Sequence, residues 1–133
     1  MSTFNLKLIT PSNELFSGKV SRLKTKNSIG EFEILSNHIS FITKTTPTIT
    51  VFEDENGKER KLFTSSGVLN FNKNELIFCC DSAEWPEDID LERAEKAKSR
   101  AENRLKDKKN TDCKRAEVAL ARAIARIDIK NNK

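Results

Sequence analysis

The sequence contains few of the residues on which most catalytic sites depend. Its one histidine, His38, stands in the polar stretch Ser36-Asn37-His38, where nothing supplies the nucleophile and carboxylate of a Ser-His-Asp or Cys-His centre. The four glycines are scattered singly and form neither of the glycine-rich loops that hold phosphate groups. The paired Cys/His spacing of a zinc site is missing as well. The sequence therefore predicts a chain that is not an enzyme by itself and that requires no metal or cofactor.

The three cysteines form no disulfide framework, because their number is odd. Cys79 and Cys80 are neighbours, and in a strand their side chains would point to opposite faces, so they do not readily share a metal ion. We interpret both as small apolar packing residues. Cys113 is isolated and has no functional interpretation.

Long apolar runs are missing too, and no stretch approaches the ~20 apolar residues of a membrane span. The first eight residues, Met-Ser-Thr-Phe-Asn-Leu-Lys-Leu, contain polar residues from residue 2 onward and lack the charged-then-apolar layout of a signal peptide. We expect the chain to stay in the compartment where it is made.

The charge is unevenly distributed along the 133 residues, which suffice for one domain or one domain plus an appendage. From Pro86 onward there are 14 basic and 10 acidic residues, so the whole formal excess of +4 lies there and the first part is neutral. A basic tail suits acidic partners or phosphate ligands. A solvated helix face is the plainer interpretation for any one of these charges.

Up to about Cys80, turn residues separate short runs in which apolar and polar residues alternate. Asn56-Gly57 suits a type I′ hairpin, whose two central residues need positive φ, and Asn72-Lys73-Asn74 predicts another turn. Such short strands predict an antiparallel β-sandwich of the ten-strand type over residues 1–85. The runs contain Phe4, Leu6 and Leu8; Phe32 and Ile34; Ile49 and Val51; Leu62; Leu69 and Phe71; and residues 75–80.

The apolar period becomes helical after Trp85-Pro86, where a proline interrupts strand pairing. Two apolar stripes follow, with Asp90 as the expected cap of the first helix and Thr111 or Asp112 as that of the second. A polar turn at 107–110 joins them, so we predict an antiparallel two-helix hairpin over residues 86–133. The stripes are Ala94, Ala97, Ala101 and Leu105, then Ala116, Leu120, Ala123 and Ile127.

The stripes are mostly alanine, and a buried alanine removes far less apolar area than the leucine or isoleucine that contributes ~1.5–3 kcal/mol. The hairpin should therefore be weakly held against the sandwich. Two interpretations remain open: an ordinary helical cap on the sheet, or a hairpin that leaves its seat for another partner.

Four parts of the sequence are distinctive in their order along the chain: Pro11–Val20, Gly30–His38, Ser66–Leu69 with Asn74–Ile77, and Lys114–Ala123. Together and in this order they resemble the epsilon subunit of bacterial F-type ATP synthases, the counterpart of the mitochondrial delta subunit. The resemblance covers essentially the whole chain. Glu33, Ser36 and Ser66 depart from the family pattern at positions where glycine or proline is common.

The resemblance implies a non-catalytic rotor subunit that couples proton flow to ATP synthesis. Its partners would be the gamma subunit, the ring of c subunits and the catalytic alpha/beta head, with the stretch around Glu31 and His38 at the gamma or c-ring contact. The helical hairpin would extend into the head and inhibit ATP hydrolysis. The implied location is peripheral, on the cytoplasmic side of a bacterial inner membrane, with membrane association only through the complex.

A shorter motif concerns regulatory ATP. Some bacterial members bind ATP at the folded hairpin through Ile/Leu-Asp-x-x-Arg-Ala, which Ile89, Asp90, Arg93 and Ala94 match. Arginines on the second helix complete that site in these relatives, and Arg122 and Arg126 stand at the matching places. A helix N-terminus and guanidinium groups favour a polyphosphate. The alternative is that Asp90 only caps the helix and Arg93 is a solvated charge.

Two rival functions remain from other classes. One is a β-sandwich adaptor that uses its basic tail on nucleic acid or protein. Because no aromatic residue follows Trp85, the tail lacks the stacking residues of single-strand binders, and we expect no nucleic-acid partner. The other is a small carbohydrate- or lipid-binding enzyme, but the sequence contains no constellation of catalytic residues to support it.

Overall fold

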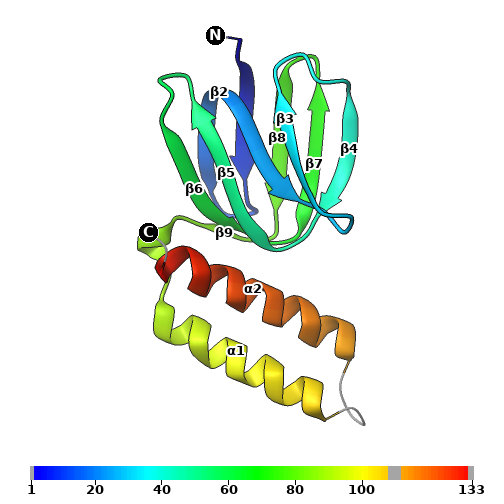
Figure 1. Ribbon diagram of the computed structural model, residues 1–133, viewed down its shortest axis with the longest axis vertical. Helices are drawn as coiled ribbons and strands as arrows, with labels where there is room; N and C mark the ends of the chain where they lie inside the picture. The colour runs from blue at the N-terminus through cyan, green and yellow to red at the C-terminus, as the bar shows by residue number, and fades with distance from the viewer. Residues whose placement is uncertain (1, 108–111, 132–133) are drawn as a thin grey trace.

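The computed structural model describes residues 2–107 and 112–131. A β-sandwich forms one end of the molecule, and two antiparallel helices lie beneath it, with α2 between the sandwich and α1 (Figure 1). The helical elements are η1 (Pro86–Asp88), α1 (Leu91–Lys106) and α2 (Cys113–Asn131). The strands are β1 (Phe4–Ile9), β2 (Glu14–Lys26), β3 (Glu31–Leu35), β4 (Phe41–Thr45), β5 (Thr48–Asp54), β6 (Glu59–Thr64), β7 (Gly67–Asn72), β8 (Glu75–Cys80) and β9 (Ala83–Glu84).

The strands follow one hydrogen-bonded path, β4-β7-β8-β1-β2-β5-β6-β9, with β3 on β2. The long strand β2 serves both layers, because its residues 14–20 pair with β1 and its residues 22–26 pair with β3. The predicted antiparallel sandwich and C-terminal hairpin are confirmed. Two details differ: the described residues form nine strands rather than ten, and β1 and β8 pair in parallel.

The sandwich core is built from the alternating apolar residues of the strands. On β1, Phe4, Leu6 and Leu8 are buried while their neighbours are exposed. The ring of Phe4 meets that of Phe71 edge-on at 5.5 Å, a favoured aromatic geometry. Residues from both layers complete this core: Val20, Leu23, Ile34, Phe52, Leu62, Leu69, Leu76, Phe78 and Cys80.

The turns correct one prediction and confirm another. Gly57 has a φ of 81°, but Asn56 is not among the residues with positive φ, so the predicted type I′ turn is wrong. The four-residue loop closes instead with the Gly57 amide donating to the Asp54 carbonyl at 3.0 Å. The turn predicted at 72–74 is present between β7 and β8, where Lys73 and Asn74 have φ of 51° and 58°, as a type I′ turn requires.

The adjacent cysteines point to opposite faces of β8, as predicted, yet only one packs as an apolar residue. Cys80 is buried in the core and Cys79 is exposed, so the interpretation of Cys79 as a packing residue is wrong. Burial raises the pKa of the Cys80 thiol to about 12, because a thiolate would lose its hydration there.

Both helices begin at aspartate caps. Asp90 accepts a hydrogen bond from the Arg93 amide at 3.1 Å, and Asp112 accepts one from the Arg115 amide at 3.3 Å, which satisfies amides that have no partner within the helix. The alternative cap Thr111 and turn residues 108–110 lie outside the described residues. Burial follows the two predicted stripes: Ala94, Ala101, Ala116 and Ala123 are buried, and Ala97, Leu105, Leu120 and Ile127 are half-buried.

A second, smaller apolar cluster joins α2 to the sandwich, and we call it the hairpin seat. It comprises Phe63, Ile89, Ala125 and Ile129, with Ile49 packed against them. Lys130 adds a hydrogen bond of 2.9 Å to the Pro86 carbonyl. The C-terminal half of α2 therefore attaches the hairpin.

Candidate functional site

A cavity at the hinge between sandwich and hairpin collects most of the residues that the ATP motif predicted, and we call it the hinge cavity. Asp90, Arg93 and Ala94 reach it from the start of α1, and Arg126 reaches it from α2. Its volume is about 350 Å³, within the range of small-molecule sites. Its lining comprises Glu84, Asp88, Asp90, Arg93, Ala94, Ala97, Arg100 and Arg126.

Two predicted residues do not line the hinge cavity. Ile89 is only 4% exposed and belongs to the hairpin seat, so its role is to anchor the start of α1. Arg122 is half-buried, one turn before Arg126 on α2, and is not among the lining residues. The structure thus brings together four of the six residues predicted from the motif.

Arg126 is the most constrained side chain in the hinge cavity. Its Nε donates to Glu84 Oε1 at 2.7 Å, and its Nη2 lies 3.5 Å from Ser82 Oγ. The guanidinium carbon is 4.4 Å from the centre of the Phe63 ring, within cation–π range. This geometry follows from strand pairing, because Glu84 of β9 sits opposite Phe63 of β6.

Sequence reasoning missed several lining residues. Glu84 and Asp88 belong to β9 and η1, which join the two units, and no motif spacing marks them. Arg100 carries a usable signal: it lies seven residues after Arg93, two helical turns further on the same face.

The charges that line the hinge cavity balance. Three arginines, Arg93, Arg100 and Arg126, are matched by three carboxylates, Glu84, Asp88 and Asp90. Guanidinium groups bind phosphate oxygens, while carboxylates accept hydrogen bonds from hydroxyl and amino groups. The cavity can therefore hold a ligand that combines anionic groups with hydrogen-bond donors.

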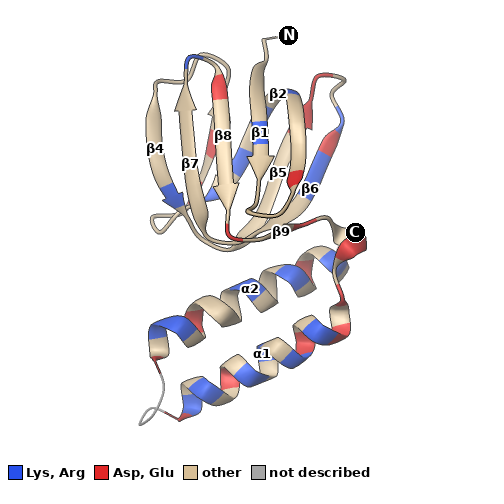
Figure 2. Cartoon of the chain, turned by 180° about the vertical axis from the view of Figure 1, so that it is seen from behind, with Lys and Arg blue, Asp and Glu red and all other residues tan. Residues whose placement is uncertain are grey.

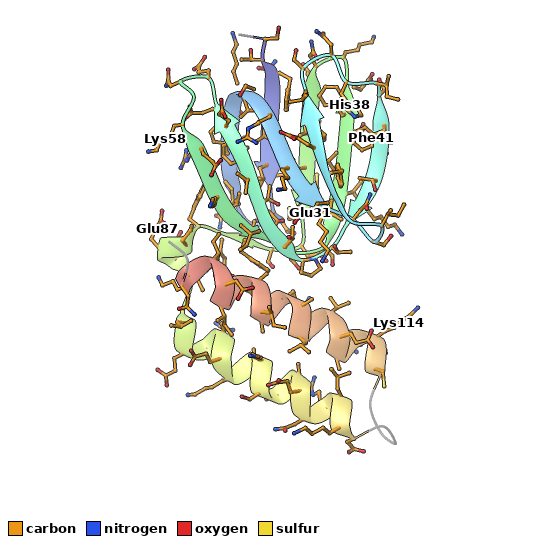
Figure 3. All side chains as sticks on the ribbon, viewed as in Figure 1. Glu31, His38, Phe41, Lys58, Glu87 and Lys114 are labelled. Carbon is orange, nitrogen blue, oxygen red and sulfur yellow. The ribbon has the colours of Figure 1, made fainter. Side chains whose placement is uncertain are left out.

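The other two predicted residues, Glu31 and His38, lie at opposite ends of β3 and are not brought together (Figure 3). Glu31 forms an ion pair with Lys24 at 3.3 Å at the end of the sandwich that faces α2. The exposed His38 packs against the Phe41 ring at 4.9 Å, and its Nδ1 lies 2.7 Å from the Ile39 carbonyl oxygen.

The two outer faces of the sandwich differ in chemistry. On the β2-β3-β5-β6 layer, Arg22 forms ion pairs with Glu33, Glu53 and Glu59 at 3.4, 3.1 and 3.1 Å. The hydrogen bond to Glu53, and then that to Glu33, raise the pKa of Arg22 above its usual value.

The outer face of the β4-β7-β8 layer carries a patch of exposed apolar side chains. Ile42 is 68% exposed, Val68 45% and Ile77 41%. Ile42 and Ile77 share a row through Asn70, and Val68 lies beside Cys79 in the next row. Figure 2 shows few charged positions on these strands and many along the helices.

Two features are absent from the part of the chain that the structure describes. Within residues 2–107 and 112–131, no group of His, Cys, Asp and Glu side chains is arranged to hold a metal ion. Neither helix, over the same residues, is both long and apolar enough to cross a bilayer.

Family models match nearly the whole chain in two consecutive parts. The β-sandwich domain of the ATP synthase delta/epsilon chain matches residues 3–86, and the long α-helix domain of the same chain matches residues 87–131.

Curated relatives agree with these matches. The ATP synthase epsilon chain of Clostridium botulinum (strain Eklund 17B) is 48% identical over 128 residues, 96% of each chain. That of Clostridium perfringens (strain 13) is 53% identical over 108 residues, 81% of each chain.

A solved structure shares the fold. A chain of the Euglena gracilis mitochondrial ATP synthase, solved with its F1 part and c-ring, superimposes with a TM-score of 0.79 at 21% identity, covering 94% of this chain and 79% of its own. The two domain matches and the clostridial relatives together show that the chain belongs to the ATP synthase delta/epsilon family.

Proposed function

We propose that the chain is a non-catalytic central-stalk subunit of a proton-translocating F-type ATP synthase, and that its hairpin regulates ATP hydrolysis. The observation that carries this proposal is the unequal construction of the two units: a sandwich with its own core holds a hairpin through one small seat. Family membership over both units supports the same function. The adaptor alternative gains no support, because both matched family models describe an ATP synthase chain.

The sandwich binds the gamma subunit through the apolar outer face of β4, β7 and β8. Exposed apolar patches on a soluble protein commonly mark protein interfaces, and Ile42, Val68 and Ile77 form such a patch. Ile77→Glu should weaken binding to purified gamma at least tenfold. Lys61→Glu, an exposed change on the ionic layer, is the control and should leave that affinity within about twofold. Equal losses would argue against this face.

The c ring is the second partner in the stalk, and the subunit is peripheral on the cytoplasmic side of a bacterial inner membrane. Because β3 separates Glu31 from His38, a change at Glu31 tests only the end of the strand where Glu31 lies. Glu31→Lys should weaken coupling of proton flow to ATP synthesis more than Lys58→Glu, which changes the β5–β6 loop. Equal effects would remove Glu31 from the contact.

The hairpin inhibits hydrolysis when it leaves its seat and enters the catalytic head. Its basic helices suit a carboxylate-rich partner, since charges attract at close range with little screening. Truncation after Asp88 tests this role. The truncated subunit should fold as a β-protein and join gamma, and the complex that carries it should hydrolyse ATP faster than the intact complex.

Two failures of the truncation experiment are distinguishable. An unfolded truncated protein would show that the helices belong to the sandwich core. A folded protein that joins gamma but leaves the hydrolysis rate unchanged would remove inhibition from the hairpin.

Regulatory ATP binds in the hinge cavity and holds the hairpin down. Arg93, Arg100 and Arg126 supply the phosphate contacts, and the carboxylates accept from nucleoside hydroxyl or amino groups. Binding with a Kd between micromolar and millimolar corresponds to about 4–8 kcal/mol, which is ample to bias a seat of this size.

Calorimetry on the isolated subunit tests the site. ATP should bind the wild type, Arg93→Ala should bind at least tenfold more weakly, and Arg115→Ala, an exposed change outside the cavity, should bind as the wild type does. No heat from the wild type up to millimolar ATP would rule out nucleotide control.

A further inference from the structure

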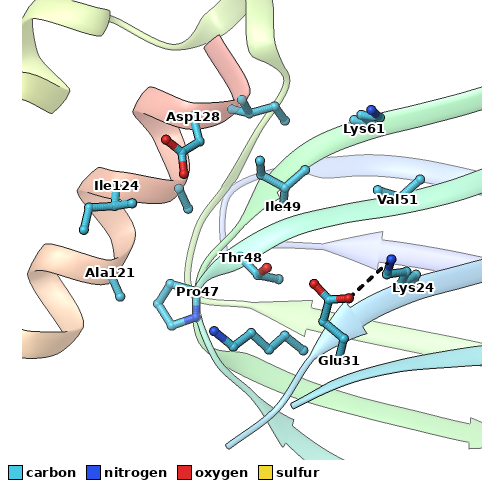
Figure 4. A pocket seen from close by; sticks show the side chains of 13 residues that line it. Lys24, Glu31, Pro47, Thr48, Ile49, Val51, Lys61, Ala121, Ile124 and Asp128 are labelled. Atoms are coloured by element: carbon cyan, nitrogen blue, oxygen red, sulfur yellow. Dashed lines mark ion pairs between the residues drawn. The ribbon is translucent and has the colours of Figure 1, made fainter. Parts of the chain in front are cut away.

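A second cavity lies between α2 and the outer face of the β2-β3-β5-β6 layer, and we call it the wedge cavity. Its volume is about 490 Å³, and it shares no residue with the hinge cavity. Figure 4 shows its lining side chains on both units, with Ala121, Ile124 and Asp128 on α2 and Ile49, Val51 and Lys61 on the strands. A molecule bound there would touch both units at once.

The wedge cavity exists because only the C-terminal part of α2 reaches the sandwich. Ala125 and Ile129 are buried in the hairpin seat, but Ile124 keeps 38% of its surface exposed. Across the gap, Ile49 and Val51 are only half-buried. Apolar side chains of both units therefore face a space that the protein itself does not fill.

Three lysines lie among the residues that line the wedge cavity. Lys24 is paired with Glu31 at 3.3 Å, and Lys61 is paired with Glu59 at 3.8 Å. Lys26 also lines the cavity and makes no ion pair with any described residue. Its ammonium group is the one available to a ligand.

The balance of charge selects the ligand class. Lys24 and Lys61 are already paired with Glu31 and Glu59, so Lys26 is the lining cation left for an anion, and a single ammonium group suits a single carboxylate. Asp128, the other lining carboxylate, disfavours a ligand with several negative charges. Apolar walls of isoleucine, valine and alanine favour a hydrocarbon body.

We propose that the wedge cavity binds an amphipathic monocarboxylate, a molecule with one carboxylate and a medium-length hydrocarbon chain. The carboxylate pairs with Lys26, and the chain packs between Ile49 and Ile124. Because the site is formed by both units, the ligand binds only when the hairpin is seated and stabilises that state by linkage. The ligand uses no residue of the hinge cavity, although its effect on ATP hydrolysis rests on the proposed function of the hairpin.

Decanoate, below its micelle concentration, is the probe. Methyl NMR of the isolated full chain without ATP should show saturable shifts of the Ile49 and Ile124 methyl groups. Ile39, Ile42 and Ile77, exposed elsewhere on the sandwich, should not shift. Comparable shifts at these isoleucines would indicate detergent-like adsorption and overturn the proposal, as would the absence of any shift.

Variants and a second probe test the chemistry. Lys26→Gln should weaken decanoate binding at least fivefold, while Lys44→Gln, a matched exposed lysine on β4, should leave it unchanged. Decanol, which has the chain without the charge, should bind at least fivefold more weakly than decanoate. Equal binding of decanol, or an unchanged affinity of Lys26→Gln, would overturn the assignment of a carboxylate to Lys26.

A last measurement tests the linkage. Saturating decanoate should slow amide hydrogen exchange across α1 and α2 in the wild type and not in Lys26→Gln at the same concentration. Binding without slower exchange would show that the site does not require the seated hairpin. This readout uses neither ATP nor the synthase complex, so its failure is distinct from failure of the proposed function.

Discussion

The sandwich core and the hairpin seat are both apolar clusters, yet they differ greatly in size. The core contains thirteen buried residues in the described part of the chain, mostly phenylalanine and leucine, and each large side chain contributes ~1.5–3 kcal/mol when fully buried. The seat contains four, one of them an alanine. From this difference we expect the sandwich to keep its structure without the hairpin, because the hairpin is attached through only a few side chains.

Polar contacts add to the hairpin seat, but the hairpin still depends on the few apolar side chains there. Arg126 is paired with Glu84, with side chains 26% and 32% exposed, and Lys130 donates to the Pro86 carbonyl. Partly exposed pairs contribute about 1 kcal/mol or less. A seat built in this way is suited to a two-state element, since modest binding energy is enough to shift its population.

Phe71→Ala should have the largest effect, because it empties space in the sandwich core. Phe71 is fully buried, and such truncations cost about 3–5 kcal/mol of unfolding free energy. Denaturant unfolding followed by circular dichroism measures it. The exposed neighbour Asn70→Ala should cost less than about 0.5 kcal/mol. Similar costs for both would contradict the assignment of the core.

Ile129→Ala should act on the seat alone. Truncation of a buried isoleucine costs about 2 kcal/mol where the site can relax, so exchange of the α1 and α2 amides should quicken roughly thirtyfold. Strand amides should keep their protection, and Ile124→Ala, at a position 38% exposed, should change little. Faster exchange of strand and helix amides together would mean that sandwich and hairpin unfold as one unit.

Much of the fold was predictable because strand alternation and helical period depend on local sequence. Phe4, Leu6 and Leu8 were predicted as one run and are buried together on β1. Local sequence did not predict which side of α2 meets the sandwich. Ala116 and Ala123 of the predicted stripe are buried but lie outside the hairpin seat. Ala125 and Ile129, which the stripe did not include, belong to the seat, and tertiary packing selects them.

Through Cys80, alkaline pH should lower the unfolding free energy of the sandwich and not the stability of the hairpin seat. The folded pKa of this thiol, about 12, lies above its ordinary value of 9.0, so its contribution to stability is complete below pH 9 and is lost as pH rises toward 12. At pH 10 the loss should be about 1.4 kcal/mol. Cys80→Ala removes this component of the pH dependence of sandwich unfolding. An unchanged pH slope in this variant would contradict the buried thiol.

The candidate site was less predictable than the fold because it is assembled from separate segments. The motif located Asp90, Arg93 and Ala94, which are close in sequence. Glu84 reaches the hinge cavity through the pairing of β9 with β6, and no spacing in the sequence reports that pairing. Arg122 and Arg126 were both predicted from the resemblance, and of the two the rotation of α2 brings Arg126 to the cavity.

Glu84→Gln should have the smallest effect on stability and the most informative one on the hinge cavity. The change keeps the shape of the side chain and removes the charge that faces Arg126 at 2.7 Å. The pair is partly exposed, so helix amides should exchange only about two- to fivefold faster. Sandwich unfolding should not change, and Glu87→Gln, an exposed change in η1, serves as the control.

The same variant should strengthen ATP binding while it loosens the empty hairpin, because Arg126 then carries a charge that no carboxylate neutralises. These opposite directions separate two roles for Glu84. If it mainly occupies Arg126 in the empty state, ATP affinity rises in Glu84→Gln, since the phosphate no longer competes with a carboxylate. If it mainly accepts hydrogen bonds from the nucleoside, the affinity falls together with the stability of the hairpin. Calorimetry and hydrogen exchange on one protein sample decide between them, and a fall in both would show that Glu84 contacts the ligand in addition to attaching the hairpin.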